Sequence, residues 1–122
     1  MLLLPKIFVA LLAIEHIYIL ILEMFLWTTP RGRKAFSSLA PDLFEKTKTL
    51  AANQGLYNGF LAAGLFWSLL IADMEWSRNV ALFFSSCILV AGIYGGLTAS
   101  KRILFVQAVP AVITLLSILY FQ

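Results

Sequence analysis

The fold is decided by the stretch LPKIFVALLAIEHIYILILEMFLW, residues 4–27. This stretch is almost wholly apolar, and a helix that crosses the hydrocarbon core of a membrane needs about 20 apolar residues. Three further runs meet or approach that length, over residues 50–72, 80–97 and 103–121. The sequence therefore predicts an all-α integral membrane protein, a bundle of four transmembrane helices that forms a single domain over residues 1–122.

The composition excludes an ordinary soluble domain. Hydrophobic residues make up 61% of the chain and charged residues 12%, against about 45–50% and 25% in soluble globular proteins. A soluble fold of 122 residues needs more polar surface to cover its core. Most aromatic residues lie within the apolar runs or at their ends and form no stacking platform interleaved with Lys and Arg, so we expect no nucleic-acid partner.

The basic residues indicate the orientation in the membrane. Residues 28–49 and 98–102 carry seven of them, and only Lys6 and Arg78 lie on the opposite side. The positive-inside rule places the seven in the cytoplasm, so both termini face outward. We expect a multi-pass protein of the plasma (inner) membrane. The seven cytoplasmic basic residues are Arg31, Arg33, Lys34, Lys46, Lys48, Lys101 and Arg102.

The connection over residues 28–49 is the only long one. Residues 28–32, TTPRG, indicate a turn that breaks the helix. Pro41 is suited to the start of a new helix, with acidic residues near its positive end, and this helix would run on into the second apolar run. Residues 36–49 form either an interfacial helix or a basic surface loop, and the sequence does not favour one of the two.

Three ionisable side chains interrupt the first apolar run. Glu15 and His16 lie near its middle, and Glu23 follows seven residues after His16, on the same helix face. A charged group at the bilayer centre costs at least about 2.5 kcal/mol, and such groups usually face the bundle interior and mark functional sites. As metal ligands the three are weak candidates, since structural metal sites contain more His and Cys, and we expect no metal site.

Polar residues also enter the second and fourth runs. Asn53 and Tyr57 are four residues apart, as are Gln54 and Asn58, so each pair shares a helical stripe. Counting about 1.5 Å per residue from the expected cytoplasmic ends puts several polar groups in two layers. The shallower layer contains Glu23, Gln54, Gly96 and Gln107, and the deeper one contains Glu15, His16, Asn58 and Thr114. The candidate ligand- and proton-binding residues are Glu15, His16, Glu23, Asn53, Gln54, Tyr57, Asn58 and Gln107.

Small residues indicate how the helices pack. Gly92 and Gly96 are four residues apart in the third run, which is the small-xxx-small pattern of closely packed membrane helices. Gly55 and Gly59 of the second run would let another backbone or a ligand come close. Pro110 should kink the fourth run and free backbone carbonyls that need partners.

Two motifs carry a family resemblance. Residues 15–27 follow the pattern EHxYIxxxEMFxW, and residues 53–62 follow NQGxYNGFLA. Together they resemble a family of small bacterial and fungal membrane proteins that is classed as a domain of unknown function. The resemblance covers nearly the whole chain. It implies four spans and an inner-membrane or similar setting, and it implies no activity.

Three functions fit these observations. The first is binding or translocation of a small solute, with Glu15 or Glu23 exchanging a proton and His16 relaying it. Four helices enclose little volume, so a homo-oligomer is expected, and a dimer is favoured. The second is a non-catalytic accessory or assembly subunit. An intramembrane enzyme acting on a lipid or quinone-like substrate ranks last, because no catalytic motif is present. No motif indicates a particular cofactor.

Overall fold

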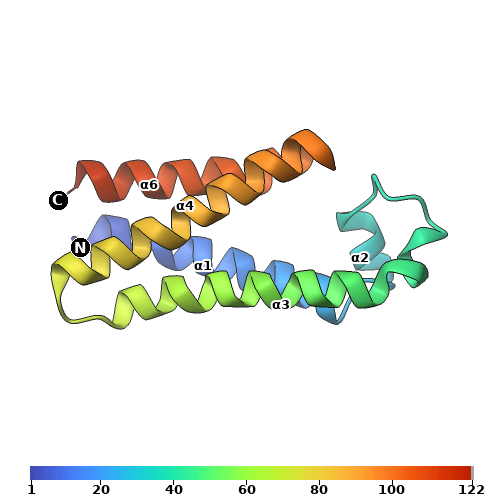
Figure 1. Cartoon of the computed structure of the whole chain (residues 1–122), viewed down its shortest axis with the longest axis horizontal. Helices are drawn as coiled ribbons and strands as arrows, with labels where there is room; N and C mark the ends of the chain where they lie inside the picture. Colours follow the sequence, from blue (N-terminus) through green and yellow to red (C-terminus); the bar gives the residue numbers. More distant parts are fainter. Residues whose placement is uncertain (122) are drawn as a thin grey trace. The chain divides into compact units, whose positions relative to one another are not determined.

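The computed structural model describes residues 1–121, and the regular structure in this range is helical throughout. Figure 1 shows the elements in order. α5, η1 and α6 follow one another without a break, so the chain contains four long helical runs and the short α2. The elements are α1 (Leu3–Met24), α2 (Pro30–Ala35), α3 (Leu43–Leu70), α4 (Met74–Thr98), α5 (Lys101–Ile103), the π-helix η1 (Leu104–Ala108) and α6 (Val109–Tyr120). The prediction of an all-α protein is confirmed.

Three of the four runs are long and apolar enough to cross a membrane: α1, α4 and the run Lys101–Tyr120. The protein is therefore a helical membrane protein. α3 is the longest element, with 28 residues and an axial length of about 42 Å. Its first half carries lysines and amides, which lower its hydropathy. The fourth span over residues 50–72 and the outward orientation of the termini stay predictions.

The long first connection contains more helix than predicted. The expected turn at residues 28–32 is wrong in part, because α2 already begins at Pro30. Proline fits the first turn of a helix, where its missing N–H needs no partner, and Thr29 caps that turn by accepting a bond from Gly32 N at 3.4 Å. Of the two alternatives that the sequence left open for residues 36–49, the structure has helix from Leu43 onward, and this helix continues to Leu70.

The described residues form two compact units. The terminal unit contains Met1–Ile14 and the chain from Leu61 onward, and the central unit contains Glu15–Phe60. The unit boundaries fall within α1 and within α3. The expectation of a single domain stays a prediction, and each unit is described by itself.

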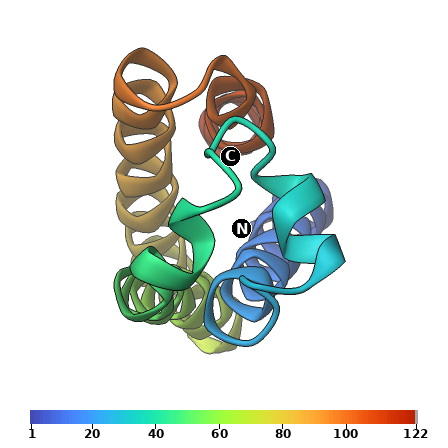
Figure 2. The same ribbon diagram turned by 90° about the vertical axis from the view of Figure 1, so that its right-hand side faces the viewer.

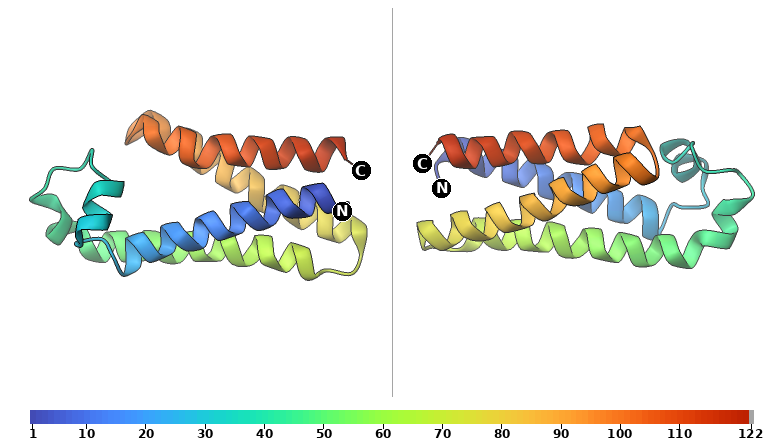
Figure 3. Two further views of the ribbon diagram at one scale, coloured as in Figure 1. Left: turned by 180° about the vertical axis from the view of Figure 1, so that it is seen from behind. Right: turned by 45° about the horizontal axis from the view of Figure 1, so that its top comes forward.

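The core of the terminal unit draws on every long helical run. In the same unit α4 lies alongside η1 and α6, as Figure 3 shows, and the Ser77 hydroxyl donates to the Ser68 carbonyl at 2.8 Å across the turn between α3 and α4. Small residues let these helices approach closely. The buried core cluster consists of Val9, Leu12 and Ala13 from α1, Leu65 from α3, Ala81 and Ile88 from α4, and Ala111 and Ile118 from α6.

The central unit is closed at the end of α1 by an aromatic cluster. The Trp27 ring lies 4.8 Å from the Phe36 ring and 5.2 Å from the Phe44 ring, centroid to centroid. Trp27 Nε1 also donates to Thr47 Oγ1 at 3.1 Å. Figure 2 shows α2 and the segment after it at this end. The connection is therefore a folded cap over the end of α1.

Candidate intramembrane polar site

A hydrogen bond between α1 and α3 forms the centre of the candidate site. Asn58 Nδ2 donates to Glu23 Oε1 at 2.7 Å and to the Gln54 carbonyl of its own helix at 3.2 Å. Glu23 and Asn58 are each only 6% exposed. A buried carboxylate needs such a partner, because an unpaired one carries a large desolvation cost. The site is thus built within the central unit, by two residues separated by 35 positions in the chain.

Two glycines bring α1 and α3 close enough for this bond. A Cβ added to Gly55 would lie 2.6 Å from Met24 Cγ and 3.1 Å from Glu23 Cβ, and one added to Gly59 would lie 2.6 Å from Leu20 Cδ1. Residue numbers rise along α3 as they fall along α1, so the two helices are antiparallel here. The space that the glycines were expected to leave for a backbone or a ligand is filled by α1.

Glu15 and His16 extend the polar region along α1. His16 is fully buried, at 0% exposure. Glu15 is half-buried, and its Oε2 atom is enclosed with no hydrogen-bond partner within residues 1–121. Leaving a buried polar atom unsatisfied costs about 1–3 kcal/mol. Such an atom needs an explanation, and a proton, a water molecule or a ligand would provide one.

The remaining candidates of α3 point away from the Glu23 carboxylate. The side chains of Asn53 and Gln54 are exposed, and Tyr57 is 59% exposed, with its ring edge-to-face against Phe60 at 5.9 Å. Glu23 therefore bonds to Asn58, not to the Gln54 side chain that depth counting placed beside it. The depths of Glu23 and Gln54 do match, because a Cβ on Gly55, the neighbour of Gln54, would lie 3.1 Å from Glu23 Cβ. Depth counting does not indicate which face of α3 meets α1, and that face carries Asn58 and not the exposed Gln54 side chain.

Gln107 and Thr114 lie in the terminal unit. Gln107 is half-buried in η1, and Thr114 is buried in α6, where its hydroxyl donates to the Pro110 carbonyl at 2.9 Å. Their predicted places in layers with Glu23 and His16 stay predictions. The sequence did not predict η1, although Pro110 was the signal for it. Proline cannot donate a helical hydrogen bond, and in η1 the Val109 N–H reaches back five residues to the Leu104 carbonyl.

Gly92 and Gly96, proposed as packing residues, face the same π-helix. A Cβ at Gly92 would lie 2.6 Å from the backbone nitrogen of Ala108, and one at Gly96 would lie 2.8 Å from Leu104 Cβ. Bulges of this kind are frequent at functional sites. In this protein the π-helix η1 packs against two glycines of α4, Gly92 and Gly96.

The sequence did not predict the polar contact between Arg31 and Tyr18 in the central unit. Arg31 Nε donates to the Tyr18 hydroxyl at 3.0 Å. Tyr18 belongs to the first motif, but its partner lies 13 residues further along, beyond a turn. No periodicity could have indicated this contact.

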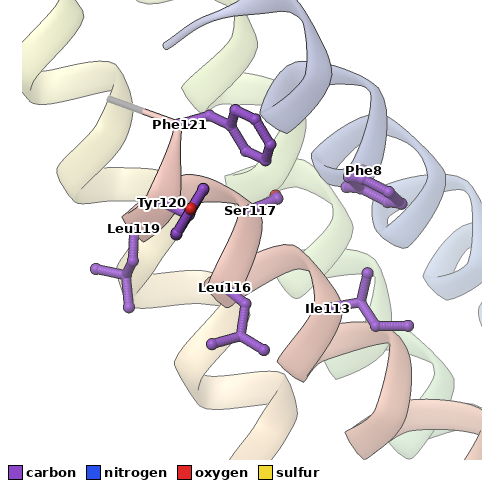
Figure 4. A pocket seen from close by; sticks show the side chains of 7 residues that line it. All are labelled: Phe8, Ile113, Leu116, Ser117, Leu119, Tyr120 and Phe121. Atoms are coloured by element: carbon purple, nitrogen blue, oxygen red, sulfur yellow. The ribbon is translucent and has the colours of Figure 1, made fainter.

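Two features of the described residues can be compared with the site, namely the potential metal ligands and a groove. No three His, Cys, Asp or Glu side chains within residues 1–121 come together to hold a metal ion. An open groove of about 530 Å³ lies in the terminal unit, and Figure 4 shows its lining. That lining is almost wholly apolar and includes none of the candidate residues. It consists of Phe8, Ile113, Leu116, Ser117, Leu119, Tyr120 and Phe121.

Apolar helices of spanning length define the class, a small helical membrane protein, and within it Glu23 and Asn58 form a buried polar pair. Residues 10–119 match the family described as "Protein of unknown function (DUF1304)", so the chain belongs to that family. The family membership predicted from the sequence is confirmed. The chain is 33% identical over 108 residues to the "Uncharacterized protein YpaA" of Lactococcus lactis subsp. lactis (strain IL1403). The aligned region covers 88% of this chain and 89% of that protein. No solved structure gives a significant match.

Proposed function

We propose that the protein binds a small solute at the buried Glu23–Asn58 pair and translocates it in exchange for a proton. The observation that carries this proposal is the 2.7 Å hydrogen bond from Asn58 to a carboxylate that is only 6% exposed. Ionisable groups inside a membrane are costly, and they are typical of substrate and proton pathways. Glu15 and His16, deeper on α1, would continue the path of the proton.

The donors and acceptors of the pair favour one class of solute. Asn58 uses its two amide hydrogens on Glu23 and on the Gln54 carbonyl. The remaining groups are the second carboxylate oxygen and the amide oxygen, which are acceptors. A solute that binds here must therefore donate hydrogen bonds, and a positive charge would strengthen the contact. We propose a small cation or a neutral hydrogen-bond donor.

The proposal includes the setting of the site. Residues 28–49 and 98–102 would face the cytoplasm across the plasma membrane, because they carry seven of the nine basic residues. The pair lies close to the end of α1 that leads into this basic connection. The solute would then reach Glu23 from the cytoplasmic side.

The proton itself is the probe for the test. The full chain is reconstituted in liposomes that contain a pH-sensitive dye, and a pH gradient is imposed with the membrane potential clamped by valinomycin. Wild-type protein should accelerate acidification, and Glu23→Gln should lose most of this flux. Infrared difference spectra between acid and neutral pH should contain a carboxyl band that disappears in the same variant.

The matched control is Glu45→Gln, which makes the same chemical change at an exposed carboxylate in the first turn of α3. It should leave both the flux and the band unchanged. If wild-type protein carries no flux, proton movement through the site in the absence of a solute is excluded, and exchange would require the solute to be present. If Glu23→Gln folds and its infrared spectrum equals that of the wild type, Glu23 does not bind a proton.

A second candidate function, a subunit that assembles with other chains, is favoured by the outer face of α3. Lys46, Asn53 and Phe60 are exposed and recur every seven residues, and Tyr57 lies beside them. Amides exposed to lipid are unfavourable, whereas an amide that both donates and accepts can pair with its own copy across a two-fold axis. We propose that a second copy of the chain covers this face.

Cysteine cross-linking tests this interface. Asn53→Cys in a Cys87→Ser background should form a disulfide-linked dimer in membranes on mild oxidation. Ser86→Cys, at an exposed position of α4, is the control and should not. Equal cross-linking at both positions would indicate random collision and exclude an interface centred on Asn53.

A further inference from the structure

Two arginines of the cap over the end of α1 have different environments. Arg33 is held within the cap: Nε donates to the Thr28 carbonyl at 3.0 Å, Nη1 donates to the Pro41 carbonyl at 2.9 Å, and Cζ lies 4.9 Å from the centroid of the Phe44 ring. These contacts tie the connection to the start of α3. Arg33 is therefore a structural cation.

Arg31 faces outward and back along α1. Its Nε donates to the Tyr18 hydroxyl at 3.0 Å, and its Cζ lies 5.6 Å from the centroid of that ring. Tyr18 is 43% exposed. It precedes Met24, the last residue of α1, by about 9 Å along the helix axis. α2 thus brings the guanidinium alongside an apolar helix that is expected to be surrounded by lipid.

The guanidinium has no neutralising carboxylate. Within residues 1–121 the single ion pair joins Lys46 to Asp42 at 3.8 Å, and no acidic oxygen lies within 4.0 Å of Arg31. Glu15 is the nearest acid along the same helix, three residues before Tyr18. Lys34 is exposed three residues after Arg31 on α2, so the two cations share a face. This positive surface lacks an anion.

The unused donors match a phosphate group. With Nε bonded to Tyr18, both Nη groups of Arg31 remain to bond two oxygens in parallel, which is the geometry in which arginine binds phosphate. The phenol oxygen accepts from Arg31, so its own O–H can donate to the same anion. Anions of this kind lie at the edge of the hydrocarbon core, as phospholipid headgroups.

We propose that Arg31, oriented by Tyr18, binds the phosphate group of an anionic phospholipid, with Lys34 as a second cation. The site is independent of the Glu23–Asn58 pair. Free phosphate offers the same chemistry, but Arg31 lies beside Tyr18, about 9 Å before the end of an apolar helix that is expected to be surrounded by lipid, where headgroup phosphates are concentrated. The lipid is therefore the source to which the proposal commits.

Lipid retention measures the site directly. The full chain is purified with equal amounts of phosphatidylglycerol and phosphatidylcholine, and native mass spectrometry counts the lipids that stay bound. Wild-type protein should retain phosphatidylglycerol preferentially. Arg31→Gln should lower that preference about fivefold, since one basic residue near a membrane surface contributes about 1 kcal/mol. Lys101→Gln, at an exposed lysine of the other basic connection, should change it little.

Two conservative variants separate oriented binding from net charge. Arg31→Lys keeps the charge but loses the planar pair of donors, and Tyr18→Phe keeps the ring but loses the hydroxyl. Both should fold and should lower the preference by a smaller factor than Arg31→Gln. Retention in Arg31→Lys and Tyr18→Phe equal to that of the wild type would overturn the oriented site.

Two further outcomes would overturn the proposal. If Lys101→Gln reduces the preference as much as Arg31→Gln, the preference reflects total charge alone. In phosphatidylcholine alone, added inorganic phosphate should not raise the unfolding temperature of the wild type. If it does, and if Arg31→Gln abolishes the rise, the ligand is free phosphate instead of a lipid.

Discussion

At the residue scale, Glu23 and Asn58 illustrate how a carboxylate is accommodated in an apolar helix. The amide donates to the carboxylate at 2.7 Å, and Gly55 removes the side chain that would otherwise separate the two helices. Hydrogen bonds to a charged group contribute about 1.5–3 kcal/mol, more than bonds between neutral groups. The pair therefore both stabilises the central unit and presents free acceptors.

Removal of the Asn58 amide should lower the stability of the protein, whereas neutralisation of Glu23 should change it little. Asn58→Ala leaves a buried carboxylate without its donor, so we expect a loss of about 1–3 kcal/mol in the free energy of unfolding. In Glu23→Gln the side-chain oxygen can still accept from Asn58, and the loss should stay below about 1 kcal/mol. Thermal unfolding in detergent micelles measures the loss of stability in both variants.

Gln54→Ala is the control for this pair of variants. The Gln54 side chain is exposed, one turn from Asn58 on the same helix, and exposed substitutions usually change stability by less than about 0.5 kcal/mol. A loss in Asn58→Ala no larger than that in Gln54→Ala would mean that the buried hydrogen bond does not stabilise the protein.

At the scale of elements, the packing of α4 on the last helical run depends on what each glycine faces. Gly92 faces backbone, the Ala108 nitrogen, whereas Gly95 faces the Cγ2 methyl of the Ile103 side chain. Backbone held in a π-helix has little room to move, but a side chain can change rotamer. Glycines three positions apart on one helix thus differ in what they tolerate.

Alanine substitutions should separate the two positions. In Gly92→Ala the added Cβ lies 2.6 Å from a backbone atom, and overpacking of this kind costs about 1–3 kcal/mol. In Gly95→Ala the Cβ meets Ile103 Cγ2 at 2.8 Å, a side-chain methyl of a half-buried residue, which can shift by a few tenths of an ångström more readily than backbone held in a π-helix. In an SDS titration, Gly92→Ala should unfold at a clearly lower SDS concentration than Gly95→Ala. The reverse order would contradict the tight approach of α4 to η1.

At the scale of the whole molecule, the path of α3 determines the number of transmembrane helices. α1, α4 and the run Lys101–Tyr120 meet the criterion for a span by length and apolarity. α3 is long enough, but it begins with lysines and carries exposed amides. If it crosses the membrane, the seven basic residues of the two connections lie on one side, which the positive-inside rule favours.

Cysteine labelling should place the two ends of α3 on opposite sides of the membrane. In a Cys87→Ser background, a membrane-impermeant thiol reagent applied to whole cells should label Asp73→Cys but not Lys48→Cys. Inside-out vesicles should give the opposite result. Labelling of both positions from the same side would mean that α3 does not span and that the protein has three transmembrane helices.

Much of the architecture follows from the sequence because it depends on local properties. The length of an apolar run determines whether a helix can span lipid, and a backbone in lipid must satisfy its own hydrogen bonds. Glu15, His16 and Glu23 could be identified because ionisable residues are conspicuous in such a run. Pro41 marked the start of α3 to within two residues.

Contacts between segments distant in the chain were decided only by the tertiary structure. Glu23 bonds to Asn58 instead of the Gln54 side chain because Asn58 shares the face of α3 that carries Gly55 and Gly59 and meets α1, and a depth count contains no information on helix faces. Arg31 reaches Tyr18 because α2 begins at Pro30 and folds back along α1. The sequence by itself determined the class of protein and which residues are costly in lipid. The packing of the helices determined which polar residues contact one another, because the two partners in each contact are at least 13 residues apart in the chain.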